Sequence, residues 1–412
     1  MIERTLAIVR AARAQLGRLG ALQVGLLGTL SAALFCIARA ARLGGGAGTF
    51  VVAGQPFTDP ATVPGGIPVL AQGGFDGQFF YRLGLDPTTV GMGRSNGIAF
   101  DYGVRGGRIG YPLLAWAGSL GGRPALLGTA MIVVNVLAVG VLAWVAAHLA
   151  TDHGRAAAWG LAIAGYWGFG IVLGRDLAEL VAAAAVFGVI LLIGRGHYWW
   201  AGAAGVVAVS TREQAVISIA MAALGVLLLQ WRRGDRAGAL LAAAKVCVPP
   251  AIVFLTWQAL VARVIGEFPA TSSSRFNPTW PLRALPGALR AWTSDGIDAV
   301  TGAGGAGMGS VLPILCFAGL AVLVGTAVTS DGLRVAWVHR PWEVLIGAGA
   351  LAVLASSSRF VLEVPADFRQ SAEVAGCGWL VIWASSGRRR YVALAVVAPL
   401  TVLVLGFRCL VL

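Results

Sequence analysis

Long apolar runs separated by short polar turns dominate the sequence. Eleven of them are candidate membrane spans, at residues 20–41, 125–150, 156–173, 177–194, 198–210, 214–231, 237–265, 306–329, 342–357, 371–386 and 391–412. A spanning helix needs about 20 mostly apolar residues, and several runs are shorter. A further apolar piece at residues 110–120 is too short to cross alone, and is either re-entrant or part of a broken helix. The pattern predicts an all-α polytopic membrane protein with about 11 spans, within a range of roughly 10–13.

Composition supports a membrane environment. The chain is 58% hydrophobic and 12% charged, whereas soluble domains carry about 25% charged residues. The net charge of +13 is spread over short loops and forms no basic stripe with interleaved aromatics, so no nucleic-acid partner is expected. The five cysteines lie in apolar segments without metal-ligand spacing, which supports neither a disulfide framework nor a zinc site.

The distribution of arginine predicts the orientation. Basic clusters that we expect in the cytoplasm are Arg4, Arg10, Arg13 and Arg18, then Arg232, Arg233 and Arg236, then Arg334 and Arg340, and finally Arg388, Arg389 and Arg390. The clusters alternate consistently if residues 110–120 do not cross. The N-terminus is then cytoplasmic, the first span is an uncleaved signal anchor, and the C-terminus is extracytoplasmic.

This orientation places the longest polar loops outside. Residues 1–412 form a single transmembrane domain whose first extracytoplasmic loop is 42–108 and whose second large one is 266–305, with a smaller outer loop at 358–369. The first loop holds several Asp and Pro residues and is too long to be a simple connector. We expect it to carry function.

Residues 74–87 (GFDGQFFYRLGLDP) are the most informative part of that loop. Phe75, Phe79 and Leu83 share a helical face and Pro87 ends the element, which predicts a short amphipathic helix lying at the outer interface. Asp76 opens this helix. Its carboxylate either caps the helix or faces a cleft as a general base, and the two roles are compatible.

Other charged residues gather near predicted outer helix ends. Arg108 precedes the apolar piece and either anchors it or binds phosphate. Asp176 and Glu179 are three residues apart and are expected to share a helix face, with Arg175 adjacent.

Two further polar stretches lie near the same face. Arg212 and Glu213 cannot share a face, so each needs its own partner, which suggests contacts between spans. A last cluster runs from Ser358 to Glu373. Ionisable groups at one membrane face suit a charged lipid headgroup better than a permeation path through the bilayer.

Two elements together resemble bacterial glycosyltransferases of the GT-C superfamily. These are residues 75–81 (FDGQFFY) in the first outer loop and residues 108–114 (RIGYPLL) at the entry into the membrane. Residues 175–179 and 211–213 look like later elements of the same pattern. The order of these elements resembles the superfamily over most of the chain. The motifs themselves are short.

The resemblance implies an inverting glycosyltransferase with a GT-C-like fold in a bacterial inner (plasma) membrane. It would move a sugar from a polyprenyl-phosphate donor to a cell-envelope glycan or glycolipid acceptor on the extracytoplasmic face. The superfamily's base is typically an Asp of the first outer loop, to which Asp76 corresponds. A second acidic residue of the early loops has no clear match, which leaves a requirement for a divalent cation (Mg²⁺ or Mn²⁺) open.

We expect outer-face arginines to hold the donor phosphate because their charge stabilises the leaving group. The candidates are Arg108, Arg212, Arg369 and Arg175, and the supporting polar residues are Asp176, Glu179, Glu213, Gln78, Tyr81 and Tyr111. Two other functions fit the sequence: a flippase or transporter of lipid-linked sugars, and a non-catalytic membrane subunit of envelope assembly. A flippase needs polar residues deeper in its spans.

Overall fold

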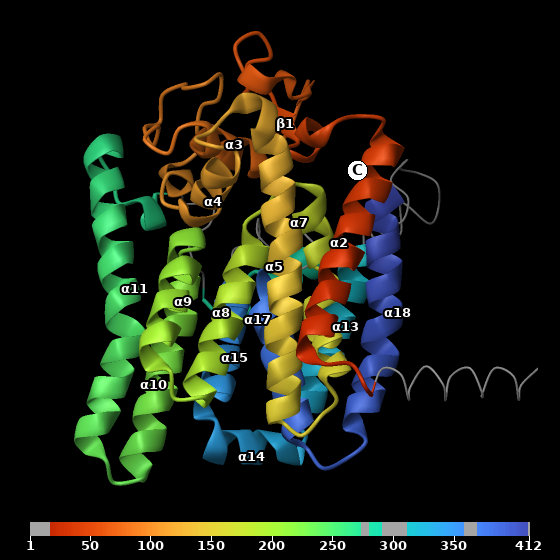
Figure 1. The fold of residues 1–412 in the computed structure, drawn as a ribbon, viewed down its shortest axis with the longest axis vertical. Helices are drawn as coiled ribbons and strands as arrows, with labels where there is room; N and C mark the ends of the chain where they lie inside the picture. Colours follow the sequence, from red (N-terminus) through yellow and green to blue (C-terminus); the bar gives the residue numbers. More distant parts are fainter. Residues whose placement is uncertain (1–16, 273–279, 291–310, 358–368, 411–412) are drawn as a thin grey trace, which may run out of the picture.

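The computed structural model describes residues 17–272, 280–290, 311–357 and 369–410. Most helices run side by side along the long axis, and the first loop forms a layer over one end (Figure 1). The bounds of the helices are α2 Ala21–Leu43, α3 Gly77–Leu85, α4 Gly110–Gly118, α5 Pro124–Asp152, α6 Leu161–Ala164, α7 Phe169–Gly174, α8 Glu179–Gly194, α9 Tyr198–Thr211, α10 Ala215–Arg232, α11 Arg236–Ile265, α13 Val311–Val328, α14 Asp331–His339, α15 Pro341–Ala355, α17 Ala372–Ala384 and α18 Arg389–Leu410.

Short elements connect these helices. Two two-residue strands, β1 and β2, pair in parallel, with Ala53 opposite Val69. The 3-10 turns and strands are η1 Ala47–Phe50, β1 Ala53–Gly54, η2 Pro64–Gly66, β2 Val69–Leu70, η3 Gly103–Arg105, η4 Ala157–Gly160, η5 Pro269–Thr271 and η7 Arg369–Ser371. The described chain is therefore mostly helical, as the hydrophobic pattern predicts.

Several helices have the dimensions of membrane spans. Among the described residues, α2, α5, α10, α11 and α18 are long and apolar enough to cross a membrane. The pair α13 and α14 is bent by 69° and adds a sixth if it counts as one span, while α8 and α15 are shorter apolar helices. The protein is a membrane-embedded helical bundle. The expected eleven spans and the orientation remain predictions. The nine-residue α4 is too short to cross, as expected.

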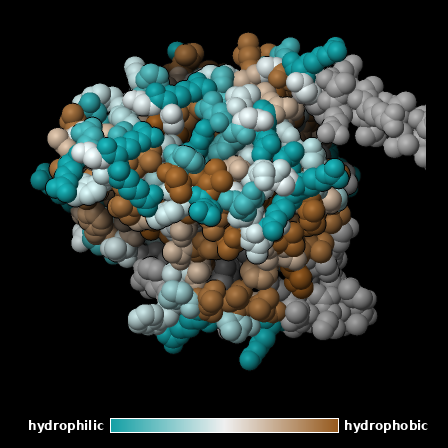
Figure 2. Space-filling view, turned by 90° about the horizontal axis from the view of Figure 1, so that it is seen from below, coloured by the Kyte–Doolittle hydropathy of each residue, from teal (hydrophilic) through white to brown (hydrophobic). Residues whose placement is uncertain are grey.

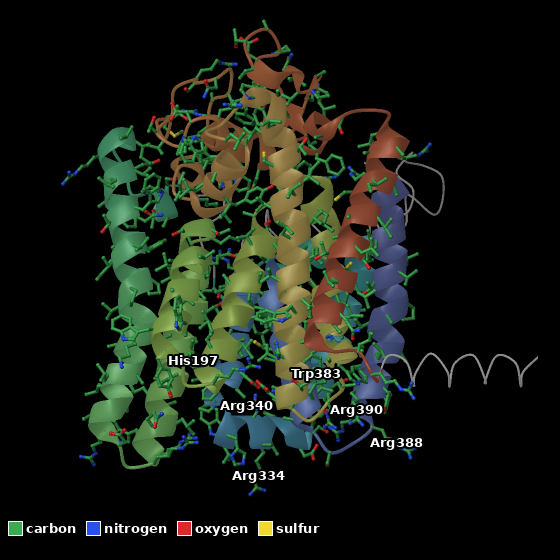
Figure 3. The ribbon with its side chains drawn as sticks, in the orientation of Figure 1. His197, Arg334, Arg340, Trp383, Arg388 and Arg390 are labelled. Carbon is green, nitrogen blue, oxygen red and sulfur yellow. The ribbon has the colours of Figure 1, made fainter. Side chains whose placement is uncertain are left out.

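The two ends of the bundle differ in charge. Residues 44–110 cover one end, called the loop end (Figure 1). Figure 2 looks onto the opposite end, where many hydrophilic side chains gather between hydrophobic ones. Arg334, Arg340, Arg388 and Arg390 all lie at this second end, called the arginine end (Figure 3). The clusters used to predict orientation thus share one end, except for residues 4–13, which lie outside the described part.

The first loop folds around α3. Phe79 contacts Phe57 and Phe100 edge-to-face, with ring centroids 5.7 and 6.0 Å apart. On another face of the helix, Phe80 meets Tyr111 at 5.6 Å. Every residue of α3 except the last is buried. The predicted short helix is confirmed, but its expected place at an exposed interface is wrong, because aromatic residues on several faces pack the loop and α4 around it.

Glycines allow α2 to pack closely on α5. A Cβ at Gly28 would lie 2.7 Å from the Cβ of Ala143, and one at Gly25 would lie 2.9 Å from the Cβ of Trp144. Within lipid there is little hydrophobic driving force between helices, so association depends on such close contacts and on interhelical hydrogen bonds. The abundance of glycine therefore has a structural use at this interface.

Replacing Gly28 with Leu should weaken the bundle. The added side chain must force α2 away from Ala143, and overpacking of this kind costs about 1–3 kcal/mol. Thermal unfolding of purified protein in a mild detergent measures the effect. Gly325→Leu is the matched control, because a Cβ there meets nothing within 4 Å. Equal melting temperatures for the two variants would contradict the tight α2–α5 contact.

Candidate functional site

Eight ionisable side chains form one network beneath the first loop. This loop-end charge cluster consists of Asp76, Asp101, Arg105, Arg108, Glu179, Arg212, Glu213 and Arg369. Its members come from the loop, from the start of α8, from the turn between α9 and α10, and from the segment before α17. Tertiary structure thus brings together charges that lie far apart in the chain.

Asp76 is the member that meets the most arginines. Its Oδ2 lies 2.8 Å from Arg105 Nη1, 3.4 Å from Arg108 Nη1 and 3.7 Å from Arg369 Nη2. The residue occupies the N-cap position of α3, but its side chain makes no capping hydrogen bond. The capping role expected from the sequence is wrong, because the three guanidinium groups hold the carboxylate instead.

The arginines control the ionisation of Asp76. Burial by itself would raise the pKa of the Asp76 carboxyl, but Arg105, Arg369 and Arg108 outweigh burial and hold this pKa well below its usual range. The side chain is 16% exposed, so water still reaches one part of it. In this arrangement Asp76 is therefore an ionised carboxylate and a weak base.

Two close approaches of the backbone hold the network in place. A Cβ at Gly77 would lie 2.6 Å from the carbonyl oxygens of both Arg175 and Val51. A Cβ at Gly110 would lie 2.9 Å from the backbone nitrogen of Thr211. Only glycine fits at these two points, which bring Asp76 beside the start of α8 and Arg108 beside the end of α9.

Arg212 and Glu213 have separate partners, as expected for neighbours that cannot share a face. Glu213 accepts two hydrogen bonds from Arg108, at 2.8 and 2.6 Å, in a bidentate pair. Burial would raise the pKa of Glu213, but Arg108 lowers it to about 2. Arg212 Nη1 donates to Glu179 at 2.5 Å. These two pairs tie the turn between α9 and α10 to the first loop and to α8.

Arg369 links the two halves of the cluster. Its Nε lies 2.9 Å from Glu179 Oε1, in addition to the contact with Asp76. Among the described residues, Nη1 of Arg369 and Nε of Arg212 have no hydrogen-bond acceptor although both atoms are buried. Buried donors without acceptors are costly, so these N–H groups favour the entry of an anion.

A narrow pocket of about 20 Å³ adjoins these donors. Its polar wall includes Arg212, Arg369 and Glu373, and its apolar wall is formed by α10 and α15 with residues such as Ile217 and Val353. Ile217 is itself 40% exposed on the outside of α10. The pocket thus lies between charged groups and the apolar surface of the bundle.

Asp176 is buried but does not share a helix face with Glu179. It sits in the turn before α8 with φ +48°, and α8 begins only at Glu179. The side chain is fully buried, and among the described residues neither carboxylate oxygen accepts a hydrogen bond. Burial raises the pKa of Asp176 well above its usual value, so the fold favours the protonated form of this carboxyl.

The other residues expected in the site serve different contacts. Arg175 stacks on Phe75, with its guanidinium carbon 3.6 Å from the ring centroid. Gln78 accepts hydrogen bonds from the backbone of Gly54 and the hydroxyl of Thr58. They brace the loop beside the cluster and form none of the ion pairs that define it.

The two tyrosines also have structural partners. The hydroxyl of Tyr81 donates to the carbonyl of Pro64, and burial raises its pKa to about 12. The hydroxyl of Tyr111 donates to the carbonyl of Met131 and accepts from Asn135. Tyr81 thus holds two parts of the first loop together, and Tyr111 fixes α4 against α5.

Sequence reasoning missed Arg105 and Asp101. Arg105 makes the shortest contact with Asp76 and pairs with Asp101 at 2.8 Å. The four-residue spacing of Asp101 and Arg105 was the sequence signal that indicates such an ion pair. Of the last predicted cluster, residues 358–368 lie outside the described part, whereas Arg369 and Glu373 line the pocket.

A divalent cation has no evident site in the described part of the chain. Within it, no group of three or more His, Cys, Asp or Glu side chains could hold a metal ion. The carboxylates of the cluster pair with arginines instead of facing one another. The described residues therefore do not fit such a cation, and no step is assigned to one.

Comparison with protein-family models, with curated proteins and with solved structures gives no match for this chain.

Replacing Asp76 with Asn should destabilise the protein at neutral pH by about 3 kcal/mol, since it leaves buried arginines unpaired. The lowered pKa means that Asp76 stabilises the fold above its usual value of 3.8, and this contribution is lost as the pH falls below that value. The melting temperatures of wild type and variant should therefore differ most at about pH 7, and the difference should shrink progressively as the pH falls below 3.8. A difference that is constant with pH would contradict the assigned charge.

Asp176→Asn should change the stability of the protein in the opposite direction to Asp76→Asn. Because the pKa of Asp176 is raised, the unfolded chain loses its proton at lower pH, so this residue lowers stability progressively as the pH rises above 3.8. Asn is neutral and tolerates a positive φ, so the variant should be at least as stable as wild type at about pH 7. Its advantage should shrink in acid. A marked loss of stability at neutral pH would show that the carboxylate has an unrecognised partner.

Proposed function

We propose that this protein is a membrane glycosyltransferase. It transfers a sugar from a polyprenyl-phosphate carrier to a cell-envelope glycan or glycolipid acceptor at the loop end, which we place on the extracytoplasmic side. The observation that carries the proposal is a pair of arginines, Arg212 and Arg369, with buried and unpaired N–H groups beside a pocket that has an apolar wall. The resemblance of residues 75–81 and 108–114 to the GT-C superfamily supports the same conclusion.

The pocket suits the two chemical parts of such a donor. Guanidinium groups bind phosphate oxygens through charge-assisted hydrogen bonds, and Arg212 and Arg369 supply them at the polar wall. The apolar wall between α10 and α15 leads toward exposed side chains such as Ile217 and Leu351, along which a prenyl chain would lie. At about 20 Å³ the pocket is too small for a phosphate, so its walls must move on binding, and we infer that the ion pairs of Arg212 and Arg369 are displaced.

Displacement of these pairs would activate Asp76. A phosphate that recruits Arg369 removes one of the positive charges now lowering the pKa of Asp76. The carboxylate then becomes a stronger base toward an acceptor hydroxyl within hydrogen-bond reach. Donor binding and base activation are in this way coupled through one shared arginine.

The proposed step is an inverting substitution. The acceptor oxygen bonds to the anomeric carbon, and the bond from that carbon to the phosphate oxygen breaks. The electron pair of this bond leaves with the carrier phosphate, where Arg212 and Arg369 stabilise the developing charge. Asp76 takes the proton of the acceptor hydroxyl.

The distribution of buried charge favours an enzyme over a flippase. In the described chain, the buried charged side chains lie toward the loop end, apart from Glu343 near the arginine end. A flippase needs a polar route between the two faces. The middle of the bundle is filled by apolar side chains such as Phe187 and Val186.

Transfer of sugar from a panel of polyprenyl-phosphate sugars by the purified protein tests the proposal. Asp76→Asn should lower kcat by about 100-fold or more, because general-base catalysis contributes about 10²–10⁴-fold. Arg369→Gln should lower kcat/KM for the donor by a similar factor. Rates must be normalised to folded protein, since both changes break buried ion pairs.

Asp59→Asn is the matched control. Asp59 lies in the same loop but bonds to Ala61 and Thr62 outside the charge cluster, so its variant should retain transfer. Near-wild-type transfer by folded Asp76→Asn would overturn the assignment of the base. Carrier-lipid binding without transfer across the whole panel would favour the flippase or the non-catalytic subunit instead.

A further inference from the structure

A second pocket, of about 390 Å³, lies at the arginine end and is far larger than the one beside Arg369. It is bounded by the turn between α8 and α9, the end of α10 and the start of α15. Volumes of this size are typical of small-molecule sites. Residues 195–198 contribute one wall and residues 339–342 another.

The charge of this pocket is positive and poorly balanced. Arg195, Arg233 and Arg340 line it together with His339, and no Asp or Glu does. Within the described chain, Arg233 makes no salt bridge, and Arg195 is only within 3.8 Å of Asp152 Oδ2. Arg340 is the better satisfied one, since it contacts Glu343 at 3.4 Å and donates to the carbonyl of Asp152.

Neutral groups add directional hydrogen bonding and an apolar wall. Gln230 donates to the hydroxyl of Tyr198 at 3.0 Å, which leaves the tyrosine hydrogen available for an acceptor in the pocket. Val226, Leu229 and Trp342 supply hydrophobic lining. An anionic group next to a hydrocarbon segment matches this combination.

The surrounding surface has the character of a membrane–water interface. Trp199 and Trp200, at the start of α9, are 63% and 69% exposed, and Trp231, at the end of α10, is 49% exposed. Exposed Trp side chains concentrate at the level of lipid headgroups. The pocket is lined by residues from the same two helix ends, and its neighbour His197 and its lining residue Arg340 lie toward the arginine end (Figure 3).

We propose that this pocket binds the headgroup of an anionic phospholipid. The arginines bind the phosphate, Tyr198 and Gln230 bind headgroup oxygens, and the apolar wall contacts the start of an acyl chain. Basic pockets between helices are known to recognise anionic headgroups. The site is separate from the loop-end charge cluster, and its function does not depend on glycosyl transfer.

Lipid binding to the purified full-length protein tests the proposal. Native mass spectrometry and thermal unfolding would compare phosphatidylglycerol, phosphatidylcholine and inorganic phosphate as probes. We expect wild type to retain and be stabilised by phosphatidylglycerol in preference to the other two. The double variant Arg195→Gln/Arg233→Gln should weaken phosphatidylglycerol binding by roughly tenfold or more, because it removes two arginines near the surface that attract anionic lipid.

Arg334→Gln/Arg388→Gln is the matched control. It removes the same charge from the same end but from exposed positions outside the pocket, so it should leave binding within about twofold of wild type. Equal losses in the two double variants would overturn a defined site in favour of general surface charge. Equal binding of phosphatidylglycerol and phosphatidylcholine would overturn it as well.

Two further outcomes are decisive. Stabilisation by inorganic phosphate equal to that by phosphatidylglycerol would replace the lipid with a soluble anion. If the pocket double variant does not fold, Arg233→Gln alone serves, because this exposed residue makes no salt bridge within the described chain. Unchanged phosphatidylglycerol binding by that variant would count against the proposal. None of these measurements involves sugar transfer, so their failure leaves the glycosyltransferase proposal standing.

Discussion

Charge neutralisation between arginines and carboxylates is the constraint on which the loop end depends. Four arginines and four carboxylates meet there with little exposure to water, and the desolvation of each charge is costly unless a partner compensates it. The pairs join the first loop to α8, to the turn between α9 and α10, and to the segment before α17. Ion pairing thus links the first loop to the helices beneath it.

The pairing of arginines with carboxylates also determines how the cluster can bind an anion. The pocket beside Arg369 measures only about 20 Å³ and adjoins these paired charges, so under the proposed function an entering anion exchanges places with a carboxylate. Because Arg369 lies between Asp76 and Glu179, that exchange alters both of them. Under the proposed function, substrate binding and the basicity of Asp76 are therefore one event.

The two ends of the bundle use arginine differently. At the loop end each arginine of the cluster faces a carboxylate, whereas Arg233 at the arginine end faces none among the described residues. Paired arginines hold protein segments together, and unpaired ones create a positive potential that attracts anionic lipid. Exposed Trp side chains next to the second pocket place it where such lipid is most concentrated.

The sequence by itself determined that the chain is a helical membrane protein, because apolar runs of this length have few other stable environments. It also singled out Asp76, Arg108, Arg212 and Glu213, since ionisable residues at the ends of apolar runs need partners. Only the tertiary structure decided which charges pair. Arg105 makes the closest contact with Asp76, whereas Asp176 is buried and its carboxylate oxygens have no hydrogen-bond partner among the described residues. Pairing depends on backbone approaches such as those at Gly77 and Gly110, between segments far apart in the chain, and no local pattern encodes them.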